Sequence, residues 1–129
     1  MESALRTALI DWLRSDGELA TSLNAVDEEA PSPSPAPTLA IAASAAADWS
    51  TKTAQGREVR IALELLDRND DPARTAGLAN RIEHRIATLP PSQPGLRVVV
   101  TQFLRSRAER RPRNLRAVLL EYRFKLLEI

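Results

Sequence analysis

The sequence predicts an α+β fold: one domain with a four-stranded, mostly antiparallel sheet and two main helices packed on one face of it. Two observations lead to this prediction. Two segments carry apolar residues at helical spacing, and four segments alternate apolar and polar residues or are rich in residues that favour strands. Their order along the chain is helix, strand, strand, helix, strand, strand, and 129 residues suffice to bury one hydrophobic core.

The first helix is expected at the N-terminus, where Leu5, Leu9 and Leu13 recur at intervals of about one helical turn. A short second helix is expected directly after it. Ser15 and Glu18 have the spacing of a capping box, in which a hydroxyl and a carboxylate each bind a free backbone amide at the start of a helix.

Residues 24–37 are expected to form a surface linker. The segment is first acidic, and prolines then alternate with small residues from position 31 to position 37. Because proline lacks an amide donor and disfavours helix in the residue before it, this stretch should be extended and solvated. A proline-rich ligand for a recognition domain is the alternative, although the segment lacks the basic or aromatic anchors of such ligands.

The next two segments predict a long hairpin. Residues 38–47 are small and apolar, and residues 57–67 alternate, with Val59, Ile61, Leu63 and Leu65 on one face. The polar residues 48–56 connect the two strands. The sequence therefore places a loop containing Trp49 at one end of this hairpin.

A helix is expected to start at Asp70-Asp71-Pro72, because a carboxylate can cap the first amides and proline is tolerated at the first helical position. Its apolar stripe continues until Pro90-Pro91 ends it. Gly77 lies inside this helix, where glycine costs about 1 kcal/mol relative to alanine, so we expect close packing there.

The last two strands form a second predicted hairpin over residues 96–107 and 115–129, joined by a basic connection over residues 105–116. Of the five aromatic side chains, Trp12, Phe103, Tyr122 and Phe124 fall on faces expected in the core. Trp49 is the one aromatic residue left for a contact.

Composition argues against catalysis. The chain has no cysteine and one histidine, His84, which is expected on a solvated helix face, so disulfides, thiolate metal sites and multi-histidine centres are excluded. The four glycines are scattered and form no phosphate-binding loop. We therefore expect no enzymatic activity, no cofactor and no metal. The longest nearly apolar run, residues 39–47, is too short to span a membrane, and we expect cytosolic synthesis.

The net charge of +1 is distributed unevenly, as −5 over residues 1–30, 0 over residues 31–95 and +6 over residues 96–129. The basic side chains concentrated near the C-terminus are Arg105, Arg107, Arg110, Arg111, Arg113, Arg116 and Arg123. Arginine binds carboxylates through two parallel hydrogen bonds, which favours pairing with an acidic surface on a neighbouring subunit. Nucleic-acid binding is the alternative, though readers of single strands usually add stacking aromatic residues.

The motif Asp48-Trp49-Ser50-Thr51-Lys52-Thr53, followed by Gly56-Arg57-Glu58 and an alternating strand, resembles the tail-terminator (tail-completion) proteins of long-tailed phages and gene transfer agents. The order of elements fits this family over most of the chain. Residues 26–37 depart from it, because family members usually have a short apolar and aromatic segment there.

The resemblance implies a hexameric ring on the head-proximal end of the tail tube, which stops tube polymerisation and joins the tail to head-completion proteins. It further implies a virion or phage-like particle assembled in the bacterial cytoplasm, with DNA passing through the ring lumen without sequence readout. Another head–tail connector or tube component, and a small arginine-rich nucleic-acid-binding domain, remain the alternatives.

Two segments supply the candidate contact residues. They are Asp48, Trp49, Ser50, Thr51, Lys52, Arg57, Arg105, Arg107, Arg110, Arg111 and Arg113. An exposed tryptophan among hydrogen-bonding residues has the composition of an interface hot spot. The alternative is a loop tryptophan that folds back onto the core.

Overall fold

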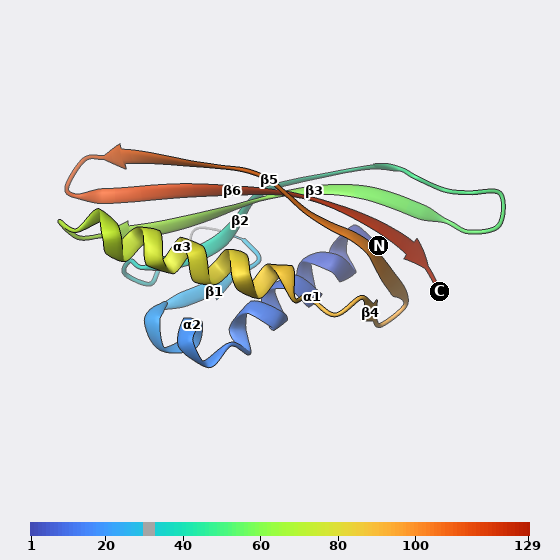
Figure 1. The fold of residues 1–129 in the computed structure, drawn as a ribbon, viewed down its shortest axis with the longest axis horizontal. Coiled ribbons are helices and arrows are strands. Elements are labelled where there is room, and N and C mark those ends of the chain that lie inside the picture. The colour runs from blue at the N-terminus through green and yellow to red at the C-terminus, as the bar shows by residue number, and fades with distance from the viewer. Residues whose placement is uncertain (30–32) are drawn as a thin grey trace.

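A computed structural model describes residues 1–29 and 33–129 as one α+β domain with three helices and a six-stranded sheet that curls around them (Figure 1). In chain order the elements are α1 (Glu2–Arg14), α2 (Gly17–Ser22), β1 (Ala25–Asp27), β2 (Thr38–Asp48), β3 (Gly56–Arg68), α3 (Pro72–Ala87), β4 (Ser92–Gln93), β5 (Leu96–Arg111) and β6 (Leu115–Glu128).

The sheet has the strand order β1-β2-β3-β6-β5-β4 and is mixed, because β1 pairs with β2 in parallel while all other neighbours are antiparallel. The predicted four strands are β2, β3, β5 and β6. The prediction of only four was wrong, because β1 and β4 extend the two edges. With three and two residues, they are too short to show an alternating pattern.

Strand β1 lies inside the segment expected to be a surface linker. Ala25, Val26 and Asp27 pair with the start of β2, and the amide of Asn24 donates to the carbonyl of Pro37 at 2.8 Å. The prediction also covered residues 30–32, which lie outside the described residues. The two described ends of the segment are thus held together beside the sheet.

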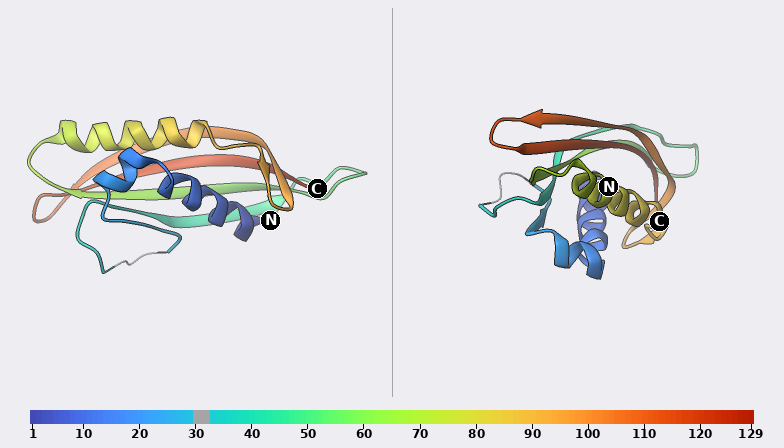
Figure 2. Two further views of the ribbon diagram at one scale, coloured as in Figure 1. Left: turned by 90° about the horizontal axis from the view of Figure 1, so that it is seen from below. Right: turned by 60° about the vertical axis from the view of Figure 1, so that its left-hand side comes forward.

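The predicted alternation in β3 and β6 is confirmed. Val59, Ile61, Leu63 and Leu65 are buried, as are Tyr122, Phe124 and their neighbours at every second position of β6. The helices cover this inner face of the sheet, and none of the helices in the described residues covers the opposite, outer face (Figure 2). All the large apolar side chains of α1 and α3 that are buried belong to the same core cluster.

Helices α1 and α3 are joined by a reciprocal pair of contacts. The indole Nε1 of Trp12 donates to the carbonyl of Arg85 at 2.8 Å, and Arg85 Nε donates to the carbonyl of Trp12 at 2.9 Å. The guanidinium carbon of Arg85 lies 3.4 Å from the centre of the Trp12 ring, a cation–π contact. Trp12 is therefore packed against the core, as predicted.

The short helix α2 is capped by Asp16, not by Ser15 as the capping-box spacing suggested. Asp16 Oδ2 accepts from the amide of Leu19 at 3.0 Å, whereas Ser15 Oγ donates to the carbonyl of Trp12. Asp16 is buried and forms an ion pair with Arg81 of α3, and these hydrogen bonds lower the pKa of its carboxyl. The ion pair with Arg81 on α3 therefore favours Asp16 over Ser15 as the capping residue.

Helix α3 begins as predicted. Asp71 Oδ1 accepts from the amide of Ala73 at 3.0 Å, and Pro72 follows at the first helical position. The expectation of close packing at Gly77 was wrong, because a side chain at that position would meet nothing within 4 Å. His84 is exposed. No helix in the described part of the chain has the length and hydropathy required to span a membrane.

Candidate functional site

The loop of residues 49–55 lies at the tip of the β2–β3 hairpin, which extends well beyond the helices (Figure 1). Five of the candidate residues lie at this tip, and Arg57 follows just inside β3. Of these six, all are exposed except Trp49 and Arg57, which are half-buried. The hairpin tip therefore presents the motif that carries the resemblance at an outer end of the molecule.

Hydrogen bonds within the tip hold its shape. Asp48 Oδ1 accepts from the amide of Ser50 at 3.2 Å, from Ser50 Oγ at 2.7 Å and from Arg57 Nη1 at 3.3 Å. Ser50 Oγ in turn accepts from the amide of Gly56 at 3.0 Å. The bonds from Ser50, more than the charge of Arg57, lower the pKa of the Asp48 carboxyl. Asp48 is therefore an acceptor that organises the backbone of the tip.

A second set of bonds closes the outermost turn. The amide of Thr51 donates to the carbonyl of Ala54 at 2.8 Å, and Thr51 Oγ1 accepts from the amide of Ala54 at 3.0 Å. Lys52 and Thr53 stand between these two residues with exposed side chains. A loop fixed in this way loses little conformational entropy when it binds, which favours a contact of defined geometry.

Gly56 is required where the strands close behind the tip. A side chain there would come within 2.5 Å of the backbone oxygen of Trp49 and 3.0 Å of that of Leu126. The amide of Trp49 donates to the carbonyl of Gly56 at 3.0 Å. The glycine in the motif is thus explained by a close approach of three strands.

The Trp49 ring is half-buried and is not part of the hydrophobic core cluster. The ammonium of Lys125, on β6, lies 5.2 Å from the ring centre. Of the two alternatives drawn from the sequence, the ring folding back onto the core does not occur. The ring instead lies beside Lys125 of β6 and is half-exposed.

The predicted arginine-rich connection is mostly strand. Strand β5 continues to Arg111, and the turn consists of Pro112, Arg113 and Asn114. Arg113 and Asn114 have φ of 64° and 59°, and the amide of Leu115 donates to the carbonyl of Pro112. Positive φ at both central residues is the mark of the type I′ turn that joins two twisted strands.

The candidate arginines divide into paired and unpaired ones. Arg105 forms an ion pair with Glu121, and Arg111 forms ion pairs with Glu64 and Glu109. These pairs raise the pKa of both arginines. By contrast, no carboxylate in the described residues forms an ion pair with Arg107, Arg110 or Arg113, and all three are exposed. Among the candidate arginines, the positive charge available to a partner therefore lies on these three residues.

The acidic N-terminal segment, expected to offer a complementary surface, largely satisfies its charges inside the subunit. Asp27 pairs with Arg14, Glu28 with Arg6, and Asp16 and Glu18 both with Arg81. A contact between this segment and the basic hairpin of another copy would have to break those pairs. The segment is thus a weaker candidate interface than its net charge indicates.

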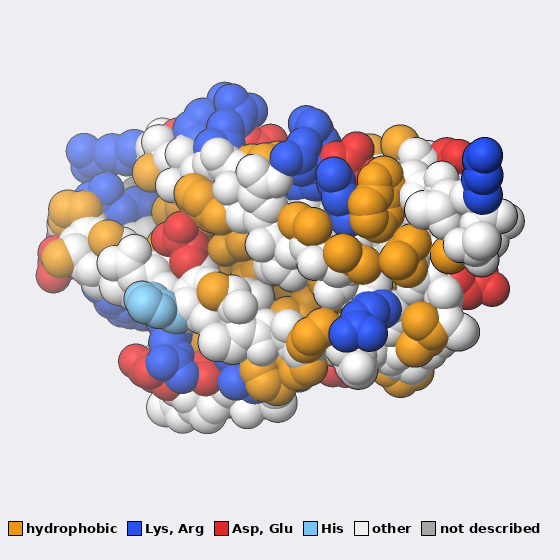
Figure 3. Space-filling view, turned by 45° about the vertical axis from the view of Figure 1, so that its right-hand side comes forward, with side chains coloured by type: hydrophobic (Ala, Val, Ile, Leu, Met, Phe, Trp, Pro, Cys, Tyr) orange, Lys and Arg blue, Asp and Glu red, His pale blue; other side chains and the backbone are white. Residues whose placement is uncertain are grey.

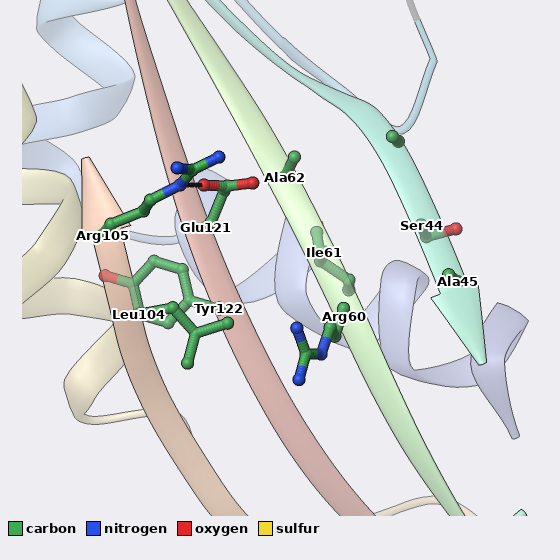
Figure 4. Close-up of a pocket in the computed structure, with 10 residues that line it drawn as sticks. Ser44, Ala45, Arg60, Ile61, Ala62, Leu104, Arg105, Glu121 and Tyr122 are labelled. Carbon is green, nitrogen blue, oxygen red and sulfur yellow. Dashed lines mark hydrogen bonds and ion pairs between the residues drawn. The ribbon is translucent and has the colours of Figure 1, made fainter. Parts of the chain in front are cut away.

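Lysine and arginine side chains gather along the upper side of the view in Figure 3, where the sheet lies. A shallow hollow of about 460 Å³ lies on this outer face, lined in part by Ala43, Ala45 and Ala62. Arg105 and Glu121 point toward one another beside it, and Arg60 projects from β3 (Figure 4). The hollow contains no histidine or cysteine. Within residues 1–29 and 33–129, no cluster of potential ligands is suited to a metal ion.

Sequence reasoning did not single out the two open edges of the sheet. Strand β1 covers only Thr38, Leu39 and Ala40 of β2, and β4 covers only Leu96 and Arg97 of β5. The amide of Val98 also donates to the carbonyl of Pro91 at 2.8 Å, and beyond these residues the sheet gives each edge strand a partner on one side only. Phe103, expected in the core, is 43% exposed on the β5 edge. The uncharged alanines of residues 42–47 are the feature of the sequence that could have predicted an open edge at β2.

Comparison with known proteins gives a family. The family described as "Tail completion protein gp17" matches residues 7–126. Among solved structures, a chain from a structure titled "Virion of native gene transfer agent (GTA) particle" superimposes with a TM-score of 0.84 at 22% sequence identity. The alignment covers 97% of this chain and 96% of that one. No curated protein matches the sequence.

The two findings are consistent with each other. The structural match establishes that this fold occurs in a chain of nearly the same length, and the family match covers almost all of the sequence. The tail completion family is structural and not enzymatic. The resemblance first noted around Asp48 and Trp49 is confirmed over most of the chain: the protein belongs to the tail completion protein gp17 family.

Proposed function

We propose that this protein is a tail terminator, which forms a hexameric ring at the head-proximal end of a tail tube in a phage or gene transfer agent particle. The ring stops polymerisation of the tube and provides the docking surface for head-completion proteins. The observation that carries the proposal is the family match over residues 7–126. The structural neighbour, from a gene transfer agent virion, supports it.

The geometry supports a role in contact. The β2–β3 tip is exposed and fixed by its own hydrogen bonds, so it suits a docking contact. In the proposal Trp49 and Lys52 contact the tube protein or the head-completion protein, and Asp48, Ser50, Thr51 and Arg57 keep the tip in shape. The unpaired arginines lie at the opposite hairpin, so the two surfaces can serve different partners.

The DNA that passes through the particle is a further proposed partner of the ring. Arg107, Arg110 and Arg113 are exposed and have no ion pair within the described residues, so they can neutralise phosphates without reading sequence. Nucleic-acid binding as the sole function is the alternative. It predicts DNA affinity for the isolated protein and no effect of the protein on tubes.

The test uses purified tail tube protein that is polymerising in solution. Addition of this protein should cap the tubes and arrest their growth, measured as tube length by electron microscopy. A Trp49→Ala variant should cap poorly, while a variant with Arg107, Arg110 and Arg113 all changed to Gln should still cap. Tubes that grow equally long with and without the protein would contradict the proposal.

A further inference from the structure

The two open edges of the sheet are unlike the edges of most soluble monomers. Exposed strand edges are usually protected by charge, proline, bulges or a covering segment, because an unpaired edge is a template for another strand. Here β1 protects the start of β2, and β4 protects the start of β5. Residues 105–111 of β5 are protected by charge, since five of these seven residues are Arg or Glu.

One segment on each edge has neither a charge, nor a proline, nor a covering strand to protect it. On β2, residues 42–47 contain only alanine and Ser44, and all five alanines are exposed. A bulge at Ala42 lies at the start of this segment, and no bulge interrupts residues 43–47. On β5, residues 98–104 carry no charge, the register shifts at Val99 and at Leu104 leave residues 100–103 regularly paired with β6, and Val99 and Phe103 are 45% and 43% exposed. These two are among the few large apolar side chains that the described surface exposes.

The two unprotected segments lie at the same level of the sheet. Following the strand registers across β3 and β6, Ala45 lies level with Gln102, Ser44 with Phe103 and Ala47 with Val100. The covered residues of β2 lie level with the charged end of β5, since Ala40 is level with Arg107. Two copies placed side by side without a shift along the strands therefore bring uncharged edge to uncharged edge.

The side chains of the two segments are also complementary in size. The β2 edge offers alanines, which leave room above and below the sheet, and the β5 edge offers Val99 and Phe103, which need apolar cover. Residues opposed across two strands lie about 4.5–5.5 Å apart, so a large side chain on one strand can cover a small one on the other. Antiparallel pairing of two β5 edges, centred on the uncharged segment, would instead place Arg97 of one copy opposite Arg105 of the other.

We infer that neighbouring subunits of the ring join edge to edge, with residues 42–47 of β2 in one copy pairing with residues 99–104 of β5 in the next. This inference rests on the proposed ring and names the surface that builds it. The four long strands alternate in direction, so copies that follow one another in the same orientation pair antiparallel at the junction. Opposite edges of one subunit make a head-to-tail contact, which closes into a ring when the rotation per copy divides a full turn.

The test is disulfide cross-linking, for which the absence of native cysteine makes the chain well suited. Ala45 and Gln102 both point to the outer face of the sheet. Within one copy they are separated by three strand spacings, about 14 Å, which is too far for a disulfide. A variant with Ala45→Cys and Gln102→Cys can therefore cross-link only between copies.

Mild oxidation of the assembled double variant should convert the monomer band on a denaturing gel into a ladder of covalent multimers. Two further variants combine Gln102→Cys with Ala43→Cys or with Ala47→Cys. They test pairings shifted by two residues in either direction, in which the cysteines still lie on the outer face of the sheet. The matched control combines Ala46→Cys with Gln102→Cys. It should give no ladder, because Ala46 points to the inner face.

The outcomes separate this inference from the ring itself. If the reduced variants form rings but oxidation gives no ladder in any of the three registers, the inferred edge pairing is wrong. The proposed ring would still stand. Covalent dimers of Ala45→Cys alone would show that two β2 edges meet, which also overturns it. A wild-type protein that forms no ring in the electron microscope would contradict the proposed function, and with it this inference.

Discussion

The two long hairpins end in different ways. The β2–β3 hairpin ends in a seven-residue loop, residues 49–55, whose backbone is held by Asp48, Ser50 and Thr51. The β5–β6 hairpin ends in a minimal turn with positive φ at Arg113 and Asn114, and Arg107, Arg110 and Arg113 at this end have no ion pair in the described residues. The first end therefore presents a fixed shape, and the second presents charge on a short turn.

This difference predicts different sensitivities. A contact made by shape should fail when the backbone of the loop is disturbed and should depend little on salt. A contact made by exposed arginines should tolerate changes in stability and weaken steeply with added salt, because such charges are screened by ions. Substitutions at the two hairpin ends therefore test this contrast through the free energy of unfolding and the salt dependence of binding.

The largest effect is expected at the loop end. Gly56→Ala forces a methyl group against two backbone oxygens, of Trp49 and Leu126, which cannot move as a flexible side chain would. Overpacking of this kind should cost about 3 kcal/mol of unfolding free energy. Urea denaturation followed by circular dichroism measures it. Gly77→Ala is the matched control, and it should stabilise by about 0.5–1 kcal/mol, since that site is open.

The next effect has the opposite sign and concerns the turn end. Arg113 and Asn114 adopt left-handed backbone conformations, which cost about 1–2 kcal/mol for most side chains but less for asparagine and glycine. Asparagine followed by glycine is the pair that this turn type favours, so the double variant Arg113→Asn with Asn114→Gly should stabilise the fold by about 1 kcal/mol. The measurement is the thermal midpoint by circular dichroism. A lower midpoint for this double variant would contradict the assigned turn.

A smaller effect depends on pH and concerns Asp48. Its pKa is lowered from 3.8 by hydrogen bonds from Ser50, so the carboxylate contributes stability above the unfolded value, and this contribution is lost as the pH falls through the folded value. The Asp48→Asn variant should be less stable than the wild type at neutral pH, and its stability should fall less steeply than that of the wild type as the pH is lowered. The measurement is the thermal midpoint of the wild type and of Asp48→Asn from pH 7 to below 3.8. If Asp48 were not an acceptor, the midpoints of the two proteins would fall with pH at the same slope.

The smallest effect on stability is expected for the unpaired arginines. Changing Arg107, Arg110 and Arg113 together to Gln should alter the unfolding free energy by less than about 0.5 kcal/mol, as for most surface substitutions. It should reduce the salt dependence of binding to DNA or to an acidic partner. Arg105→Gln, which breaks the pair with Glu121, serves as the comparison. Equal salt dependence in the wild type and the triple variant would contradict the assignment.

The parts of the fold that follow local rules could be predicted from the sequence. Alternation placed Val59 and Ile61 inward, and Asp71 with Pro72 marked the start of α3. The strands β1 and β4 could not be predicted, because pairs of two or three residues form only where the folded chain brings a neighbour close. The cap at Asp16 was missed for the same reason, since its partner Arg81 is distant in sequence.

The candidate site was predictable in composition and not in detail. The motif from Asp48 to Lys52 located the loop, but the separation of paired from unpaired arginines depends on where Glu64 and Glu121 lie in the sheet. The uncharged edge segments required the strand order, because only the topology shows which sides of β2 and β5 lack a partner. The arginine cluster and the β2–β3 loop could therefore be predicted from the sequence, whereas the uncharged edge segments could be recognised only in the fold.

In the proposed function, copies of this chain assemble into a closed ring. Native mass spectrometry of the purified protein, combined with electron microscopy of the same sample, can detect that ring. We expect a single species of six times 14.2 kDa that appears as a ring. A monomer at every concentration, or open filaments without a closed species, would contradict it.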